Sequence, residues 1–189
     1  MSEQKQLLDD VLQECDHMNK LVNDLLMLSR LDSGRLILEN ETISLPEFIQ
    51  EIHRQLLRLA EQQGVRLELG PLEGAILGDA TRIRQVLLIL LDNALRNTSP
   101  GGVIRLETIP QGRYVHIIVS DTGRGIPAEH LPHVFERFYK VNDTPDSEHR
   151  RSGLGLSLAR MFVEAQGGRI QIASQEGQGT TVTLRMPLQ

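Results

Sequence analysis

Residues 115–127 read VHIIVSDTGRGIP, an apolar, strand-like run that ends on an aspartate and continues into two closely spaced glycines. A plain turn does not need this combination. The carboxylate of Asp121 could accept hydrogen bonds from an exocyclic amine such as that of adenine. Gly123 and Gly125 would then let the backbone approach a flat base without a Cβ in the way. The same residues also fit an Asx turn followed by a glycine bend, and the stretch alone does not separate these interpretations.

The composition limits the possible classes of protein. The chain has 189 residues and a net charge of −5, which argues against general binding to nucleic acid or to an anionic membrane. The single cysteine, Cys15, cannot form an internal disulfide and fits a reducing compartment. No apolar run approaches the roughly 18–20 residues that span a bilayer, and the acidic start MSEQKQLLDD is not a signal peptide. We therefore expect a soluble, cytoplasmic chain, and a membrane anchor upstream is compatible with this.

The first part of the sequence predicts one long helix. Residues 3–33 contain neither Gly nor Pro, and Gly34 is the expected C-cap. Apolar residues recur in alternating steps of three and four, at Leu8, Val11, Cys15, Met18, Val22 and Leu25. Four leucines widen this seam: Leu12, Leu21, Leu26 and Leu28. Such a stripe needs a partner helix, from the same chain or from a second copy.

The rest of the sequence mixes helices and strands. Helices are expected over 45–63, 79–97 and 153–166, with shorter helical pieces near 128–137. Strands are expected near 35–44, 65–69, 103–109, 113–120, 169–174 and 180–186. Ser44 and Glu47 form the pattern of a capping box at the start of the first of these helices. This order predicts a two-layer α/β sandwich, with three helices over one face of a mixed or antiparallel sheet.

Three more patches do not by themselves indicate a function. Asn93, late in an apolar helix, could ligate Mg²⁺ beside a polyphosphate that Arg96 faces, or it could hydrogen-bond a neighbouring loop. In FERF (135–138), the phenylalanines are most often local core and Arg137 a surface charge. Gly153 and Gly155 could direct backbone N–H groups at a phosphate, or could form a flexible hinge.

Together and in this order, these patches resemble the catalytic ATP-binding domain of sensor histidine kinases, over about residues 40–187. The motifs that carry the resemblance are Asn93 in its buried helix, DTGRG (121–125), FERF, GLGL (153–156) and GQGTT (177–181). The resemblance implies an α+β fold, the Bergerat two-layer sandwich shared with DNA gyrase and related ATPases. It also implies ATP and Mg²⁺ as ligands, with Asn93 on the metal and Asp121 reading the adenine amine. The implied ATP-binding residues are Asn93, Arg96, Asp121, Gly123, Gly125, Ile126, Arg137, Lys140, Arg151, Gly153, Leu154, Gly155, Leu156 and Thr180.

The resemblance further implies a domain organisation. Residues 24–34 resemble the end of the second helix of the family's dimerisation and phosphoacceptor domain. The implied parts are 1–34 as that helix, 35–44 as linker and first strand, and 45–189 as the catalytic domain with an ATP lid at about 137–152. Homodimerisation through the first helix and transfer of phosphate to a response regulator receiver domain are implied for the full-length protein.

The family's phosphoacceptor pattern is missing from this sequence. None of the six histidines is followed by an acidic residue and an Arg-Thr-Pro-like stretch: His17, His53, His116, His130, His133 and His149. In the family that histidine lies on the first bundle helix, which here would precede Met1. The chain is therefore expected to be a piece of a longer kinase that is not self-sufficient.

Two departures from the family pattern affect the expected site. Ile89 stands where the family usually has a second asparagine and where related ATPases place a glutamate base, so a gyrase-type hydrolase is disfavoured and metal affinity is expected to be lower. Arg150 and Arg151 replace glycines and could clamp the γ-phosphate or be solvated. Two other classes stay open: a nucleotide-binding regulatory module without phosphotransfer, and a dimerisation or docking module.

Overall fold

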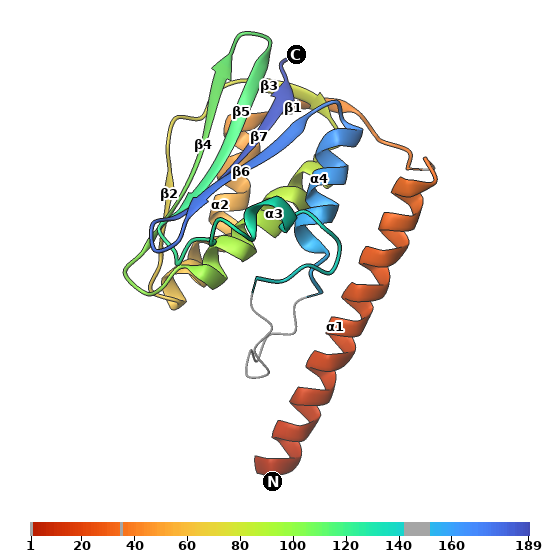
Figure 1. Ribbon diagram of the computed structural model, residues 1–189, viewed down its shortest axis with the longest axis vertical. Coiled ribbons are helices and arrows are strands. Elements are labelled where there is room, and N and C mark those ends of the chain that lie inside the picture. Colours follow the sequence, from red (N-terminus) through yellow and green to blue (C-terminus); the bar gives the residue numbers. More distant parts are fainter. Residues whose placement is uncertain (1, 35, 142–151) are drawn as a thin grey trace.

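The computed structural model describes residues 2–34, 36–141 and 152–189. Its helices are α1 (Ser2–Asp32), α2 (Leu45–Gln62), α3 (Ala80–Asn97) and α4 (Gly155–Ala165), with a 3₁₀ turn η1 (Leu131–His133). Its strands are β1 (Glu41–Ser44), β2 (Arg66–Leu69), β3 (Ala75–Gly78), β4 (Val103–Gln111), β5 (Tyr114–Asp121), β6 (Arg169–Gln175) and β7 (Gly179–Pro187). Helices α2, α3 and α4 lie on one side of the main sheet, and α1 extends away as a long rod (Figure 1). The predicted α+β sandwich preceded by a long helix is confirmed.

The main sheet is mixed. Five strands lie in the order β2-β4-β5-β7-β6, with β2 parallel to β4 and every other neighbouring pair antiparallel. A separate antiparallel pair joins β1 to β3. The sequence reading missed β3, because a four-residue strand is too short to show a clear alternation. It also ended β4 too early, since Pro110 pairs with Val115 and the hairpin reverses only after Gln111.

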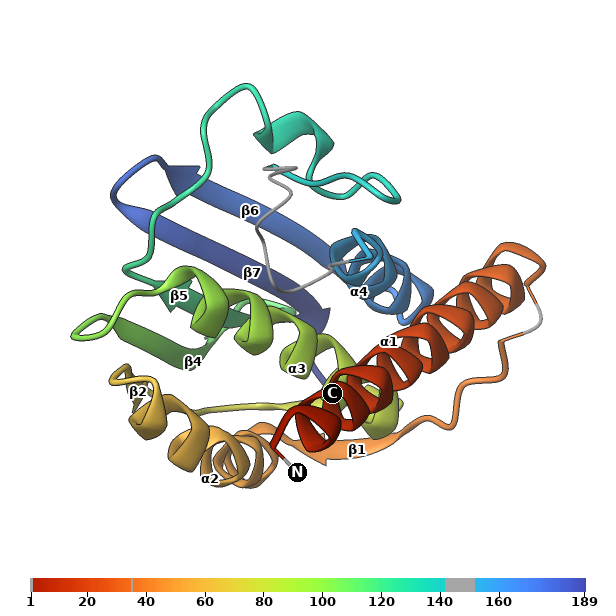
Figure 2. The same ribbon diagram turned by 90° about the horizontal axis from the view of Figure 1, so that it is seen from below.

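The core lies between the sheet and the three helices. Alternate residues of the central strand β5, Val115, Ile117 and Val119, are buried, as the period of two requires. The apolar centre of α3 is buried on most sides, as its sequence predicts. The residues between these strand positions point to the other face, over which no described helix lies (Figure 2).

Two predicted helix caps have different outcomes. Asp79 caps α3, because its Oδ1 accepts the backbone N–H of Arg82 at 3.0 Å. The capping box at Ser44 does not form: the Ser44 hydroxyl donates to the Glu47 carboxylate, and its oxygen accepts no backbone N–H of the helix. Ser44 is also the last residue of β1, opposite Ala75, so strand pairing rather than capping sets its backbone.

Helix α1 has one packed part and one open part. Leu28 is 2% exposed and belongs to the core cluster, and α1 contacts α4 there (Figure 2). Gly34 has φ +64°, as expected for the residue that follows the helix. Among the α1 side chains that the structure describes, several large apolar ones are exposed: Val11, Leu12, Met18, Val22, Leu25 and Leu26. Among the described residues, no helix has both the length and the apolar character to cross a bilayer.

Candidate functional site

The loop after β5 is built around Asp121. This residue ends β5 opposite Thr180 of β7, and its Oδ1 accepts the backbone N–H of Gly123 at 2.8 Å. The Asx turn considered above is therefore present. Burial raises the pKa of Asp121 above its ordinary value of 3.8, and the backbone N–H groups of Gly123 and Thr180 offset part of this rise. An ionised carboxylate has about four acceptor positions, so the turn leaves capacity for a further donor.

The two glycines of the loop are required by the protein itself. A Cβ on Gly123 would lie 2.3 Å from the Asn97 carbonyl oxygen, and one on Gly125 would lie 2.0 Å from that of Gln175. Between them, the Arg124 N–H donates to the Asn97 carbonyl at 3.1 Å. The loop is thus clamped between the end of α3 and the β6–β7 turn. Backbone packing alone therefore already requires glycine at both positions. The predicted close approach of a flat base would be a second reason for the absence of a Cβ.

Ser174 is a residue of this loop region that the sequence reading missed. Its hydroxyl oxygen accepts the Ile126 N–H at 2.8 Å, donates to the Gly179 carbonyl at 2.8 Å and lies 2.9 Å from the Thr180 hydroxyl. One hydroxyl therefore fixes the end of the glycine loop to the start of β7. In the sequence, Ser174 is one polar residue of an alternating strand and gives no signal of this role.

One face of α3 connects the two glycine motifs. Ile89, Asn93 and Asn97 follow one another at steps of four and so lie on the same side of the helix. Ile89 contacts the GLGL motif, because a Cβ built on Gly155 would lie 3.2 Å from the Cγ2 of Ile89. At the other end, the backbone carbonyl of Asn97 packs against Gly123 of the DTGRG loop. The eight residue steps from Ile89 to Asn97 span about 12 Å of helix. Asn93 therefore lies between the start of α4 and the DTGRG loop.

The side-chain amide of Asn93 is available. Asn93 is half-buried, and its backbone carbonyl accepts the Asn97 side-chain amide at 2.6 Å. Within the ranges that the structure describes, no group hydrogen-bonds the Asn93 side chain. The alternative, a hydrogen bond from the Asn93 side chain to a neighbouring loop, is thus not seen in the described part of the chain. A half-buried amide oxygen of this kind suits a hard cation shared with phosphate oxygens.

The GLGL motif forms the start of α4, as expected. Leu154 is fully buried, and its carbonyl accepts the Ser157 hydroxyl at 2.8 Å. Gly153 has φ +69°, and its carbonyl accepts the N–H of Phe138 at 3.0 Å. Phe138 also has a positive φ, of 65°. The hydrophobic contact of Leu154 and the glycine conformation together orient the α4 N-terminus toward the Ile89 side of α3.

The cations predicted to face phosphates have carboxylate partners in the structure. The Nε of Arg96 lies 2.9 Å from both carboxylate oxygens of Asp92, one turn earlier in α3. An Nη of Arg137 lies 2.6 Å from Asp32 Oδ1, at the end of α1. This pair lowers the pKa of Asp32 and raises that of Arg137. Lys140 is exposed, and Arg150 and Arg151 lie outside the described residues. Phosphate contacts by these residues stay predictions.

Two hollows are found on the described surface. One, of about 450 Å³, is lined by residues of the FERF region and of α4: Phe135, Glu136, Arg137, Ser157, Arg160 and Met161. The other, of about 490 Å³, lies at the end of the sheet beside the β4–β5 turn. Neither is lined by Asn93 or Asp121. Among the described residues no group of three or more His, Cys, Asp or Glu could hold a metal, so a cation here would rely on Asn93 and on its ligand.

The sequence has known relatives. The family described as "Histidine kinase-, DNA gyrase B-, and HSP90-like ATPase" matches residues 78–189, and "His Kinase A (phospho-acceptor) domain" matches residues 1–34. Sensor protein SrrB of Staphylococcus aureus is 33% identical over 184 residues, which cover 97% of this chain and 32% of that protein. The chain thus spans about a third of the length of the curated relatives it matches.

Solved structures agree with this. Full-length ShkA, solved in complex with AMPPNP, is 25% identical with a TM-score of 0.86, covering 100% of this chain and 39% of that one. The catalytic domain of histidine kinase ThkA is 26% identical with a TM-score of 0.67, covering 79% of this chain and 95% of that one. Histidine kinase AdeS of Acinetobacter baumannii has the same fold, with a TM-score of 0.80 at 24% identity, over 96% of this chain and 84% of that one. The chain belongs to the histidine kinase-, DNA gyrase B- and HSP90-like ATPase family, and within it to the sensor histidine kinases.

Proposed function

We propose that this chain binds ATP and Mg²⁺ and transfers the γ-phosphate to a histidine on a dimerisation helix of its full-length kinase. From that histidine the phosphate passes to the aspartate of a response regulator receiver domain. Residues 1–34 are the second helix of the dimerisation domain, 35–44 the linker and first strand, and 45–189 the catalytic domain with a lid at about 137–152. The kinase works in the cytoplasm.

The α3 face carries this proposal. It places the free amide of Asn93 about 6 Å along the helix from Ile89, at the α4 N-terminus, and from Asn97, at the DTGRG loop. A nucleotide has its base at one end and its phosphates at the other. The half-buried carboxylate of Asp121 fits the adenine amine, and the α4 N-terminus fits an anion.

The chemical demands on the protein are modest. Bound Mg²⁺ neutralises charge on the β- and γ-phosphates, and Asn93 would be its protein ligand. The contribution of the chain is to hold the base and orient the phosphates toward the acceptor, since phosphoryl transfer is mainly positioning and charge stabilisation. Ile89 packs against Gly155 and carries no polar group, so this chain has no general base there for attack by water. This favours transfer to a histidine over hydrolysis.

The first test is calorimetric binding of ATP, with and without Mg²⁺, to the chain and to Asn93→Ala. We expect ATP binding by the parent chain that Mg²⁺ strengthens, and binding by the variant that Mg²⁺ no longer strengthens. Asn97→Ala is the matched control, because its amide bonds a backbone carbonyl of the same helix and is not assigned to the metal. Absence of ATP binding by the parent chain would leave only dimerisation or docking.

Transfer needs a second measurement. ATP labelled at the γ-phosphate is incubated with the chain and with a separate helix that carries the phosphoacceptor histidine of a relative. Acid-labile label on that helix, lost when its histidine is replaced by glutamine, supports the kinase. Tight Mg²⁺-dependent binding without transfer to any tested acceptor would instead indicate a nucleotide-binding regulatory module.

A further inference from the structure

A row of basic residues crosses the open face of the sheet. Arg169 of β6 lies directly opposite Arg185 of β7, and Arg185 lies directly opposite His116 of β5. Neighbouring strands are about 4.8 Å apart, so the two guanidinium groups start from adjacent positions on one face. Arg169 is exposed and Arg185 is half-buried. Like charges directly opposite in a sheet destabilise it, so this pairing needs a reason.

At the other end of the same face, an arginine is paired with carboxylates. Arg105 of β4 lies 3.0 Å from the carboxylate of Glu107 and 4.0 Å from that of Glu68. Among the described residues, by contrast, no carboxylate forms an ion pair with Arg169 or Arg185. In the described part of the chain, carboxylates thus neutralise Arg105 at one end of the face, whereas Arg169 and Arg185 at the other end have no such partner.

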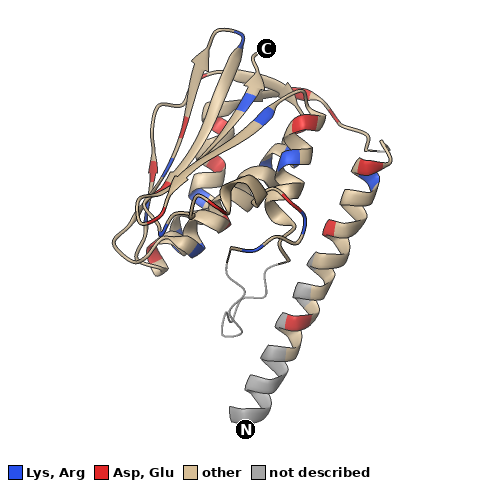
Figure 3. Ribbon diagram, viewed as in Figure 1, with Lys and Arg blue, Asp and Glu red and all other residues tan. Residues whose placement is uncertain are grey.

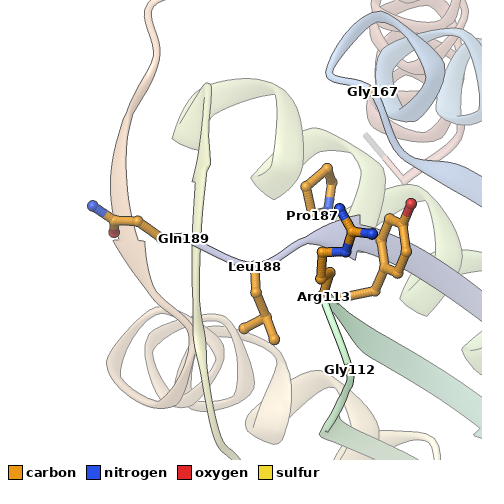
Figure 4. A pocket seen from close by; sticks show the side chains of 7 residues that line it. Gly112, Arg113, Gly167, Pro187, Leu188 and Gln189 are labelled. Carbon is orange, nitrogen blue, oxygen red and sulfur yellow. The ribbon is translucent and has the colours of Figure 1, made fainter.

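The basic end of the face also has a defined shape, formed by an aromatic ring beneath Arg185 and a hollow beside it. The guanidinium carbon of Arg185 lies 3.7 Å from the centre of the Tyr114 ring, so the ring supports its flat side and leaves its N–H edges free. Blue segments gather on β6 and β7 at this end of the sheet (Figure 3). Tyr114 also lines the open hollow of about 490 Å³ beside the β4–β5 turn. Six other residues complete the lining (Figure 4): Gly112, Arg113, Gly167, Pro187, Leu188 and Gln189.

We infer that this end of the sheet, the arginine face (Arg113, Arg169 and Arg185 with His116 and Tyr114), docks an acidic protein segment that also carries an apolar side chain. The carboxylates would pair with Arg169 and Arg185, whose planar forks suit bidentate contacts. The apolar side chain would enter the hollow beside Pro187 and Leu188. This surface lies on the face opposite the helices that carry the ATP site, and so it is a separate function of the chain.

Charge and shape favour a protein segment over the other anionic partners. A membrane surface attracts a broad basic face, whereas this face carries Glu68 and Glu107 at its other end and the chain has a net charge of −5. A small anion such as phosphate would use the arginines but not the adjoining hollow with its proline and leucine. An acidic segment with an apolar anchor uses both.

The test is fluorescence anisotropy of a labelled octapeptide of alternating Glu and Leu, titrated with the whole chain. We expect saturable binding that weakens with added salt. Arg185→Glu and Arg169→Glu should each raise the Kd about tenfold. The matched control is Arg58→Glu, the same charge change at an exposed position of α2 on the other side of the molecule, and it should leave the Kd within about twofold.

A stability measurement separates a docking role from a structural one. In either arginine variant a glutamate faces an arginine across the strands, so the melting temperature should stay the same or rise while peptide binding weakens. ATP binding should be unchanged in both. The inference is overturned if the parent chain does not bind the peptide, if Arg58→Glu weakens binding as much, or if a Lys-Leu peptide binds equally well. Full displacement by millimolar phosphate, or co-sedimentation with phosphatidylglycerol vesicles that the arginine variants lose, would also overturn it in favour of a small anion or a membrane.

Discussion

The two ends of the α3 face are built differently. At the DTGRG end, the loop from Asp121 to Gly125 touches protein backbone on both sides and is fixed by hydrogen bonds to Asn97 and Ser174. Two of the cations expected to meet phosphate, Arg137 beside the GLGL motif and Arg96 on α3, are instead held by carboxylates of the protein. In the proposed nucleotide site, the end for the base is thus formed in advance, whereas the end for the phosphates must exchange partners before its cations can serve a nucleotide.

This difference divides the work of binding. A preformed base site loses little conformational entropy when adenine enters, so it should supply most of the affinity. Arg96 and Arg137 can contact a nucleotide only by giving up their ion pairs with Asp92 and Asp32. Because exposed ion pairs are weak, exchanging one for another changes the affinity little. We therefore expect substitutions at the base end to have large effects and those at the phosphate end to have small ones.

The largest effect is expected for Gly125→Ala. Its new Cβ would lie 2.0 Å from the Gln175 carbonyl oxygen, and φ is +68°. We expect a loss of about 3 kcal/mol or more in the free energy of unfolding, together with loss of ATP binding. Urea unfolding and calorimetry measure the two. Gly177→Ala is the control, since φ is +74° there but nothing lies within 4 Å of the added Cβ, and it should cost only about 1–2 kcal/mol.

Asp121→Asn tests whether charge, and not only shape, matters at the base end. Loss of a charge-assisted hydrogen bond to adenine should weaken ATP binding about tenfold to a hundredfold. The asparagine oxygen can still accept the Gly123 N–H, so the turn should persist. Because burial raises the pKa of Asp121 above 3.8, ATP affinity of the parent should fall with acidification at pH values above 3.8. Calorimetry across that range checks this, and a flat profile would contradict it.

The same raised pKa has an opposite effect on folding. Between 3.8 and the folded-state pKa, the folded chain binds more protons than the unfolded chain. The contribution of Asp121 to stability is therefore fully present below 3.8 and is lost as pH rises through the folded-state value. At pH 7 the Asp121→Asn variant should be at least as stable as the parent. Urea unfolding of both proteins at pH 3.5 and 7 measures this. The advantage of the variant in the free energy of unfolding should shrink or change sign at pH 3.5.

The sequence predicted the backbone geometry of the DTGRG loop better than the contacts of the arginines, for a physical reason. Asp121, Gly123 and Gly125 act through local backbone geometry, which short-range spacing reveals. The pair of Arg96 with Asp92 also follows a local pattern, the four-residue spacing of ion pairs along one helix. The pair of Arg137 with Asp32 joins positions 105 residues apart, and no local pattern predicts such a contact.

The fold shows the same division. Long periodic segments such as α1 and α3 were predicted close to their observed ends, because the burial of a whole face determines them. The strand β3 and the tie at Ser174 were missed. Each depends on one or a few residues whose partners are supplied by distant parts of the chain, here β1 for β3 and the glycine loop for Ser174.

A smaller effect is expected when Arg96 is released. Asp92→Asn removes its carboxylate partner, so the guanidinium can reach a phosphate, and ATP affinity should rise about threefold. Arg96→Gln should lower it by a similar factor. Both variants should bind adenosine as the parent does, because adenosine has no phosphates. If Asp92→Asn weakens ATP binding instead, Asp92 itself serves the site and the assignment of Arg96 is wrong.

The smallest effect on ATP affinity is expected for Asp32→Asn, because Asp32 and Arg137 are both largely solvated; we expect a rise of about twofold or less. The pair is better measured directly, by following the Asp32 carboxyl carbon in an NMR titration. Arg137 lowers the pKa of Asp32, so the contact should persist above 3.8 and be lost only as pH falls through the lower folded-state value. In Arg137→Gln the titration should return toward 3.8. An unchanged titration in that variant would mean that α1 and the phosphate end are not joined by this pair. A return toward 3.8, with tighter ATP binding by Asp32→Asn, would mean that the end of α1 competes with the nucleotide for Arg137.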